Sequence, residues 1–219
     1  MKNFLYKEWN LCLSPVNFIF LIFVTMMLIP NYPCYVALFY LCVSIFFIFN
    51  NGEINRDMEY SLILPITKRD IVKSRCVIVC FYEILGLLLM VPFAFISKKL
   101  IPSGNLAGID GNVAFFGFAM IPITVFHYIF FTCFYKKAEK PGIPFLLGSI
   151  GFWVAYGILE FPIWTKDIFG VKIFLMLDST DLNSQVKQLP ILIAGLVVFI
   201  VGWIITYERA SRKFERVDL

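Results

Sequence analysis

Six apolar segments separated by short polar stretches constrain the fold of this chain most. They cover residues 15–29, 35–49, 76–96, 113–134, 143–161 and 189–207. With 60% hydrophobic residues and a mean hydropathy of +0.82, the chain is far more apolar than an average soluble protein. A bilayer leaves unpaired backbone groups unsatisfied, so we expect these segments to be helices. The sequence predicts an all-α integral membrane protein, one transmembrane domain over 1–219 with six transmembrane helices.

The first two apolar segments are short for membrane spans. Each has 15 residues, whereas a transmembrane helix needs about 20. We expect each to borrow flanking residues or to sit in a thinned bilayer. A re-entrant pair at this position is the alternative.

The distribution of basic residues predicts the orientation. If the amino terminus is cytoplasmic, the cytoplasmic segments contain 14 of the 19 Lys and Arg residues and the outside loops contain the rest. The outside residues are Lys98, Lys99, Lys166, Lys172 and Lys187. Because basic residues concentrate in cytoplasmic loops, both termini and the segment 50–75 are predicted to be cytoplasmic.

Two further stretches are apolar without being able to cross a membrane. Residues 1–13 alternate apolar and charged side chains as interfacial helices do; a signal peptide is disfavoured because no small-residue cleavage site follows. The outside loop 162–188 contains an apolar run at 168–177. Since ten residues cannot span the hydrocarbon, we expect a re-entrant or interfacial element before the sixth helix.

The charged stretch 50–75 has the signals of a helix, a turn and a second helix. Thr67 and Asp70 have the spacing of a reciprocal cap, and Pro65 disfavours helical backbone at Leu64. A preceding helix should therefore end near residue 63, and its apolar residues recur every four positions, at Ile54, Met58 and Leu62. A second helix over 68–97 would be about 45 Å long against roughly 30 Å of hydrocarbon, so it should project into the cytosol.

Lys68 and Arg69 fall in the first turn of this second helix, where the macrodipole favours acidic groups. One explanation is that they set topology and meet lipid phosphates. The other is that the turn inserts into an acidic groove of a cytosolic partner.

This stretch resembles the cytosolic coupling helix of permeases of the type-2 ABC exporter family. The matching residues are Asp57, Glu59, Tyr60, Leu64, Pro65, Ile66, Thr67, Lys68, Arg69, Asp70, Ile71, Val72 and Lys73. Within the family, the chain is most similar to the membrane subunits that export phenol-soluble modulins and antimicrobial peptides. The re-entrant element expected before the last helix is also shared with the family.

The resemblance implies a permease subunit in a bacterial plasma membrane, paired with a second copy of itself or a homologous permease and surrounded by membrane lipid. A cytosolic ABC ATPase dimer would dock below it, and the substrate would be an amphipathic peptide. The residues implied in ATPase coupling are Asp57, Glu59, Tyr60, Leu62, Pro65, Ile66, Thr67, Lys68 and Arg69. ATP and Mg²⁺ would bind the partner ATPase.

Motifs for catalysis do not occur in the sequence. It contains no G-x-x-x-x-G-K-[ST] phosphate loop, no H-E-x-x-H and no G-x-S-x-G. We therefore expect no enzyme activity, no catalytic residue and no cofactor bound by this chain. Cys76 and Cys80 lie one helical turn apart without a His or acidic neighbour, so a metal site is not expected. The net charge of +4 gives no indication of a nucleic-acid partner.

Two ionisable residues lie inside predicted spans. Glu83 and His127 are each eight residues from the predicted cytosolic boundary of antiparallel segments, so they should share a depth. Charges in hydrocarbon usually mark a cavity or a pairing. One hypothesis places Glu83 on a substrate path, facing a water-filled cavity with His127 as its partner. The alternative is a structural Glu–His hydrogen bond, or a neutral Glu83.

Other functions are compatible with the same sequence. A membrane-embedded peptide-binding or immunity protein would need no ATPase, and an ABC exporter for drugs or lipids would share the fold. A channel or ion-coupled carrier would favour inverted repeats or several intramembrane charges, which are not evident. Retention of an ATPase separates the exporter from the binding protein.

Overall fold

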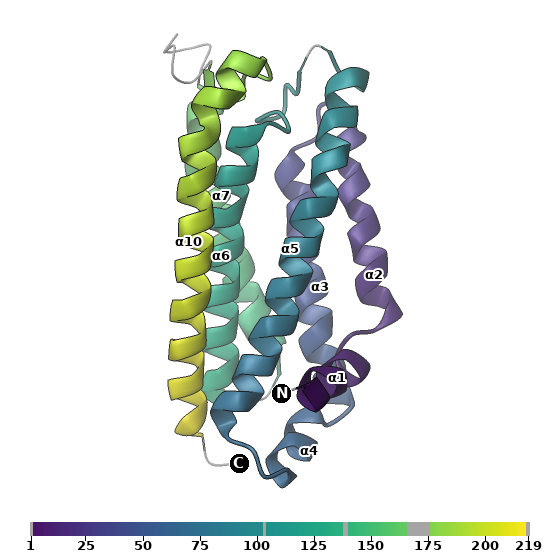
Figure 1. Cartoon of the computed structure of the whole chain (residues 1–219), viewed down its shortest axis with the longest axis vertical. Helices are drawn as coiled ribbons and strands as arrows, with labels where there is room; N and C mark the ends of the chain where they lie inside the picture. Colours follow the sequence, from purple (N-terminus) through teal and green to yellow (C-terminus); the bar gives the residue numbers. More distant parts are fainter. Residues whose placement is uncertain (1, 103, 138–139, 166–175, 218–219) are drawn as a thin grey trace.

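The computed structural model describes residues 2–102, 104–137, 140–165 and 176–217, and within them it has helices and no strand (Figure 1). The helices run in the order α1 (Lys2–Leu11), α2 (Pro15–Ile22), the 3₁₀ helix η1 (Phe23–Leu28), α3 (Cys34–Ile54), α4 (Asp57–Ile63), α5 (Lys68–Leu100), α6 (Val113–Lys137), α7 (Gly142–Trp164) and α10 (Leu182–Glu215). The predicted all-α class is confirmed.

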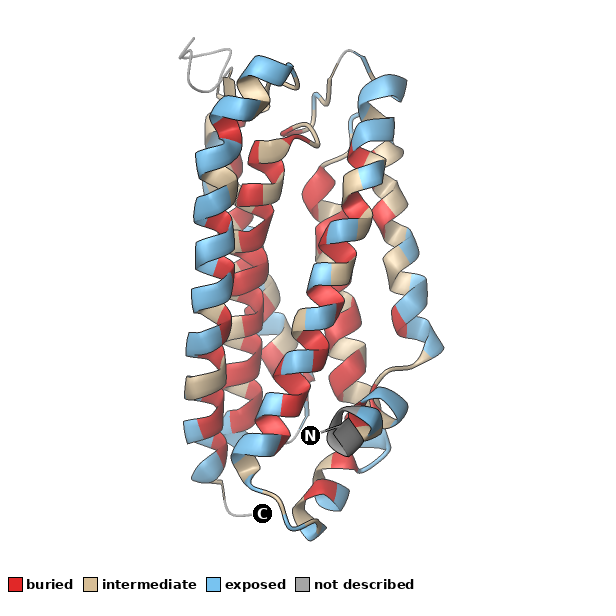
Figure 2. Cartoon of the chain, viewed as in Figure 1, coloured by how far each residue is buried: buried red, intermediate tan, exposed pale blue. Residues whose placement is uncertain are grey.

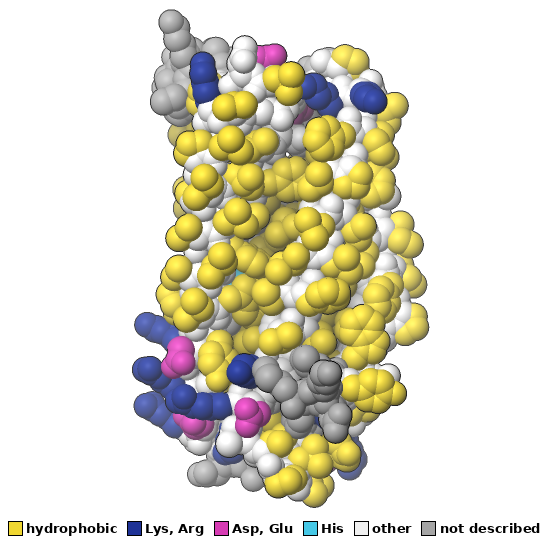
Figure 3. All heavy atoms as spheres, in the orientation of Figure 1, with side chains coloured by type: hydrophobic (Ala, Val, Ile, Leu, Met, Phe, Trp, Pro, Cys, Tyr) yellow, Lys and Arg dark blue, Asp and Glu magenta, His cyan; other side chains and the backbone are white. Residues whose placement is uncertain are grey.

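Five of these helices, α3, α5, α6, α7 and α10, are long and apolar enough to cross a membrane. On the face that Figure 3 shows, hydrophobic side chains cover the middle, and the visible Lys and Arg side chains lie toward the two ends. The chain is therefore a multi-pass membrane protein. The predicted element at 168–177 falls largely outside the described residues.

The two short segments behave differently. The second gains flanking residues, as predicted, and becomes the 21-residue helix α3. The first remains short, since the apolar stretch Pro15–Leu28 consists of one α-helix followed by a 3₁₀ helix. Its length is about 24 Å, against roughly 30 Å of hydrocarbon. Six complete spans thus remain a prediction.

Helix α6 lies at the centre of the bundle and packs against α10, α7 and α3. It is largely buried, whereas α10 presents an exposed face (Figure 2). Gly117 of α6 and Gly195 of α10 allow this packing, because a Cβ at Gly195 would lie 2.1 Å from the Gly117 carbonyl oxygen. Small residues at such a contact let membrane helices approach closely.

One end of the bundle contains α1, α4 and the last turns of α10 (Figure 1). Helix α1 lies across the bundle axis there, within the region predicted to be interfacial. Its position at the membrane surface, and the side of the membrane that this end faces, stay predictions. We call this end the coupling end.

Candidate functional site

The coupling segment, residues 50–75, has the predicted form of a short helix, a turn and the start of a second helix, α4 followed by α5. Helix α4 ends at Ile63, before Pro65. At the start of α5, the Thr67 amide donates to the Asp70 carboxylate and the Asp70 amide donates to Thr67 Oγ1, both at 3.2 Å. The reciprocal cap predicted from the sequence is therefore confirmed.

The first part of the segment differs from the prediction, because Ile54 belongs to α3 and not to the short helix that follows. Arg56 has a left-handed backbone conformation, with φ at 49°, and this separates helix α3 from helix α4. Tertiary contacts favour this break. The Asn55 side-chain amide donates to the Leu11 carbonyl at 2.7 Å, which ties the end of α3 to the α1–α2 connection.

Four charged side chains, three of them buried and Lys7 partly buried, meet between α1, α4 and α5. Arg75 of α5 pairs with Glu8 of α1 at 2.6 Å and with Asp57 of α4 at 2.5 Å. Lys7 of α1 pairs with the same Asp57 at 2.5 Å. Glu8 and Asp57 are at most 1% exposed, so the carboxylates depend on these cations for compensation. Together, the two carboxylates and the two basic groups have no net charge. We call these four residues the buried charge cluster.

Neutral side chains complete the surroundings of the cluster. Ser74 donates to Glu8 at 3.3 Å, and Lys7 donates to Ser61 at 2.5 Å. The Arg75 guanidinium lies 4.9 Å from the centre of the Phe49 ring, and a Cβ at Gly52 would come within 3.0 Å of it. The cluster therefore joins α1, α4 and α5 to each other and packs them against α3.

Glu8, Asp57 and Cys12 bring their ligand atoms within 4.8 Å of one another, a spacing that a metal ion can use. The carboxylates are already occupied by Lys7 and Arg75. Burial raises the pKa of the Cys12 thiol well above its usual range, which disfavours the thiolate that binds metals. The donor set is thus that of an ion-pair cluster.

The structure divides the residues predicted for ATPase coupling into three groups. Asp57 is buried in the charge cluster, whereas Leu62, Ile66 and Lys68 are half-buried, the first two of them against the core. Those with exposed side chains are Glu59, Tyr60, Pro65, Thr67 and Arg69. Ile63, which the prediction omitted, is 84% exposed and the most exposed large apolar side chain of the described residues. Asp57 therefore supports the segment from inside the bundle, whereas Leu62 anchors α4 and Ile66 anchors the turn that follows it.

Lys68 and Arg69 contact the end of α10. Arg69 Nε donates to Glu215 at 2.8 Å, and Lys68 donates to the Val217 carbonyl at 2.5 Å. Lys68 also lies 5.7 Å from the centre of the Phe214 ring. The carboxyl end of a helix attracts cations, so a partner within the chain accounts for a basic pair that is unfavourable in the first turn of α5. Their predicted contact with an ATPase is a separate hypothesis.

Glu83 and His127 meet, as their shared depth predicted, with His127 Nδ1 3.3 Å from the carboxylate. A third residue, Trp203 of α10, donates its indole N–H to Glu83 at 3.0 Å and stacks on the imidazole at 4.1 Å between ring centres. Glu83 and His127 are 0% exposed. This is the geometry of the structural alternative, since Glu83 is enclosed by side chains of its own subunit.

A family model described as ABC-2 family transporter protein matches residues 2–209, nearly the whole chain. The chain belongs to the ABC-2 transporter family. No curated protein and no solved structure matches it. As an ABC-2 member it is a membrane transport subunit, and permeases of this family generally work with an ABC ATPase.

In this ABC-2 protein, sequence reasoning missed the partners that the fold supplies. Glu8 and Arg75 are 67 residues apart, and Trp203 is 120 residues from Glu83. A charged residue within an apolar segment, such as Glu83, signals that some partner exists. It does not indicate which residue that is.

Proposed function

We propose that this chain is the permease subunit of an ATP-driven exporter of amphipathic peptides, powered by a separate ATPase dimer that docks on the coupling segment. The observation that supports docking is the exposed apolar surface of α4 at the charged coupling end. Tyr60 and Ile63 of α4 are 53% and 84% exposed, and α4 lies at the end of the bundle (Figure 1). Apolar side chains gathered among charges favour a protein partner.

The mechanical link supports the same proposal. Helix α4 is joined to α5 by the four-residue turn 64–67 and through the buried charge cluster, so force applied to α4 would act on α5 without a flexible connection. Arg75 sits near the start of the 33-residue helix α5, which is about 50 Å long. A rigid-body shift of α4 would therefore move a helix that traverses the bundle.

The remaining parts of the proposal rest on the family and on the resemblance of the coupling segment. A second copy or a homologous permease would complete the path, and ATP and Mg²⁺ would bind the ATPase. The amphipathic peptide substrate rests on the resemblance to peptide exporters, with drugs and lipids as other substrates of the same fold.

A matched pair of substitutions tests the docking surface. Ile63→Asp alters the apolar surface of α4, and Leu106→Asp changes a side chain with nearly the same exposure, 83%, at the opposite end of the bundle. Burying an isoleucine contributes about 1.5–3 kcal/mol, so Ile63→Asp should weaken ATPase binding roughly tenfold or more. Leu106→Asp should leave it unchanged. The measurements are retention of a P-loop ATPase during purification of the tagged chain in lipid nanodiscs, and its ATP hydrolysis.

Two results oppose the proposal. Wild-type protein that retains no ATPase points to the peptide-sequestering alternative. An ATPase retained equally by wild type and Ile63→Asp places the docking surface elsewhere. Peptide export is measured separately, as ATP-dependent uptake of a labelled amphipathic peptide into inverted vesicles.

A further inference from the structure

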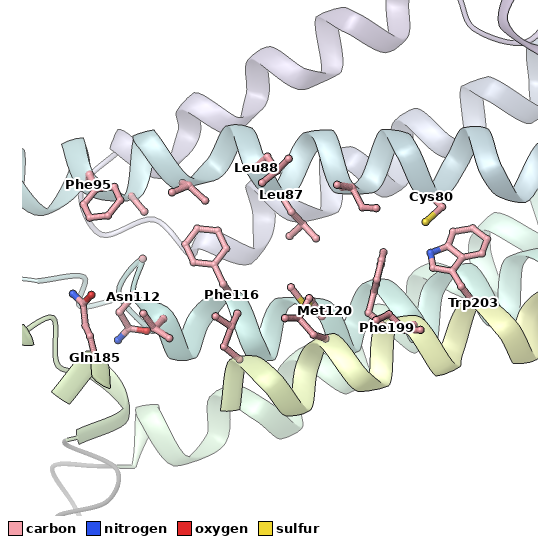
Figure 4. Close-up of a pocket in the computed structure, with 18 of the residues that line it drawn as sticks. Cys80, Leu87, Leu88, Phe95, Asn112, Phe116, Met120, Gln185, Phe199 and Trp203 are labelled. Carbon is pink, nitrogen blue, oxygen red and sulfur yellow. The ribbon is translucent and has the colours of Figure 1, made fainter. Parts of the chain in front are cut away.

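A long groove runs between α5 on one side and α6 and α10 on the other (Figure 4). Its volume is about 680 Å³, and its lining runs from Cys80 and Trp203 to Lys98 and Gln185. In the space-filling view the groove is a hollow within the apolar middle of the molecule (Figure 3). None of the residues that line the groove belongs to the coupling segment or to the buried charge cluster.

The lining is polar at one end only. Lys98, Asn112 and Gln185 lie at the end far from α4, and Lys98 is the one charged residue among the described lining residues. The side-chain amides of Asn112 and Gln185 donate to the carbonyl oxygens of Leu177 and Thr180. Lys98 donates to the Thr180 carbonyl, and an ammonium has three donors. The Lys98 ammonium therefore has N–H donors beyond the one that contacts Thr180, and it lies at the end of a groove that is apolar along the rest of its length.

The length and the cross-section of the groove indicate which kind of molecule fits into it. Cys80 and Lys98 are 18 residues apart on α5, so the groove is about 27 Å long. A volume of about 680 Å³ over that length gives a mean cross-section of roughly 25 Å². One extended aliphatic chain fits a groove of this length and section.

The mouth of the groove is lined by exposed apolar side chains, among them Leu88 at 63%, Phe95 at 65% and Ile200 at 57%. Behind them, Leu87, Met120 and Phe199 are at most 8% exposed. A chain can thus enter sideways from the hydrocarbon. The buried inner side chains meet it only when it lies inside.

We propose that this groove binds one acyl chain of an anionic phospholipid from the surrounding bilayer, with the lipid phosphate at Lys98. The polarity of the groove matches that of a lipid, with an anion at one end and hydrocarbon along the rest. This site needs no ATPase, so its test is independent of the proposed transport function.

The test uses photo-crosslinking of the full chain in phosphatidylcholine nanodiscs. Trace phosphatidylglycerol with a photoreactive group within one acyl chain is compared with phosphatidylcholine carrying the same chain, and labelled residues are mapped by mass spectrometry. We expect phosphatidylglycerol to label Leu87, Met120 and Phe199 about fivefold more than phosphatidylcholine does, as one basic residue near the headgroup predicts. Lys98→Gln should abolish this preference. Lys99→Gln, which changes an exposed neighbour outside the lining, should preserve it.

A second pair of variants tests the groove itself. Leu88→Trp fills its mouth and should remove labelling of the buried residues, whereas Ile158→Trp, on the exposed face of α7, should not. Equal labelling by the two lipids, or a preference that survives Lys98→Gln, would overturn the site. So would labelling by neither lipid together with Leu88→Cys crosslinks between two copies, because a second subunit would then fill the groove.

Discussion

Replacing Arg75 with glutamine tests whether the buried charge cluster holds α1, α4 and α5 together. In the wild type, Arg75 and Lys7 balance Glu8 and Asp57. Arg75→Gln leaves two buried carboxylates facing one lysine. Removing one partner of a buried ion pair typically costs about 3–5 kcal/mol, because the remaining charge is uncompensated.

A double variant separates the loss of charge compensation from the other effects of removing Arg75. Glu8→Gln combined with Arg75→Gln leaves Asp57 paired with Lys7 at 2.5 Å, so charge is again balanced. We expect the double variant to be about 1–3 kcal/mol more stable than Arg75→Gln alone. Arg56→Gln is the control, since the Arg56 side chain is 80% exposed and pairs only at the surface; its effect should stay below about 1 kcal/mol.

Cys12 provides the assay. Its side chain is 0% exposed beside the cluster, so a thiol-reactive dye reaches it only when α1 separates. With the other cysteines replaced, the temperature at which Cys12 reacts should fall by roughly 6–20 °C in Arg75→Gln, equivalent to about 3–5 kcal/mol. If Arg75→Gln reacts like wild type, or if the double variant is less stable than the single one, the cluster is not held by charge compensation.

Two further predictions concern the other polar contacts. Arg69→Glu should lower ATP hydrolysis by the complex. If Arg69 acts through α10, adding Glu215→Arg should restore hydrolysis, because the two side chains meet at 2.8 Å and the swap keeps opposite charges there. If the double variant retains the ATPase equally but hydrolysis is not restored, Arg69 contacts the ATPase instead. Glu83→Gln retains an acceptor for the Trp203 indole but replaces one carboxyl oxygen beside His127 with an amide nitrogen. We therefore expect a thermal midpoint lower by a few degrees, about 1 kcal/mol, with transport per folded molecule unchanged. Altered peptide transport at unchanged stability would support the substrate-path hypothesis for these two residues.

The sequence by itself determined the class of fold and the local form of the coupling segment. Apolar segments of membrane length have to be helical, and the cap of Thr67 with Asp70 forms between residues three positions apart. Pro65 stops α4 through its own covalent geometry. These outcomes depend on neighbours along the chain, so a linear sequence contains the information for them.

Only the tertiary structure decided which charges pair and where α3 ends. The partners in the Glu8–Arg75 contact come from different helices, and the contact exists only after α1 and α5 have packed. Helix α3 continues to Ile54 because its last turn is held by the α1–α2 connection. The basic pair Lys68 and Arg69 has its partners at the far end of the sequence for the same reason. A periodic pattern shows that a side chain needs compensation, and the packing of helices distant in sequence determines which group provides it.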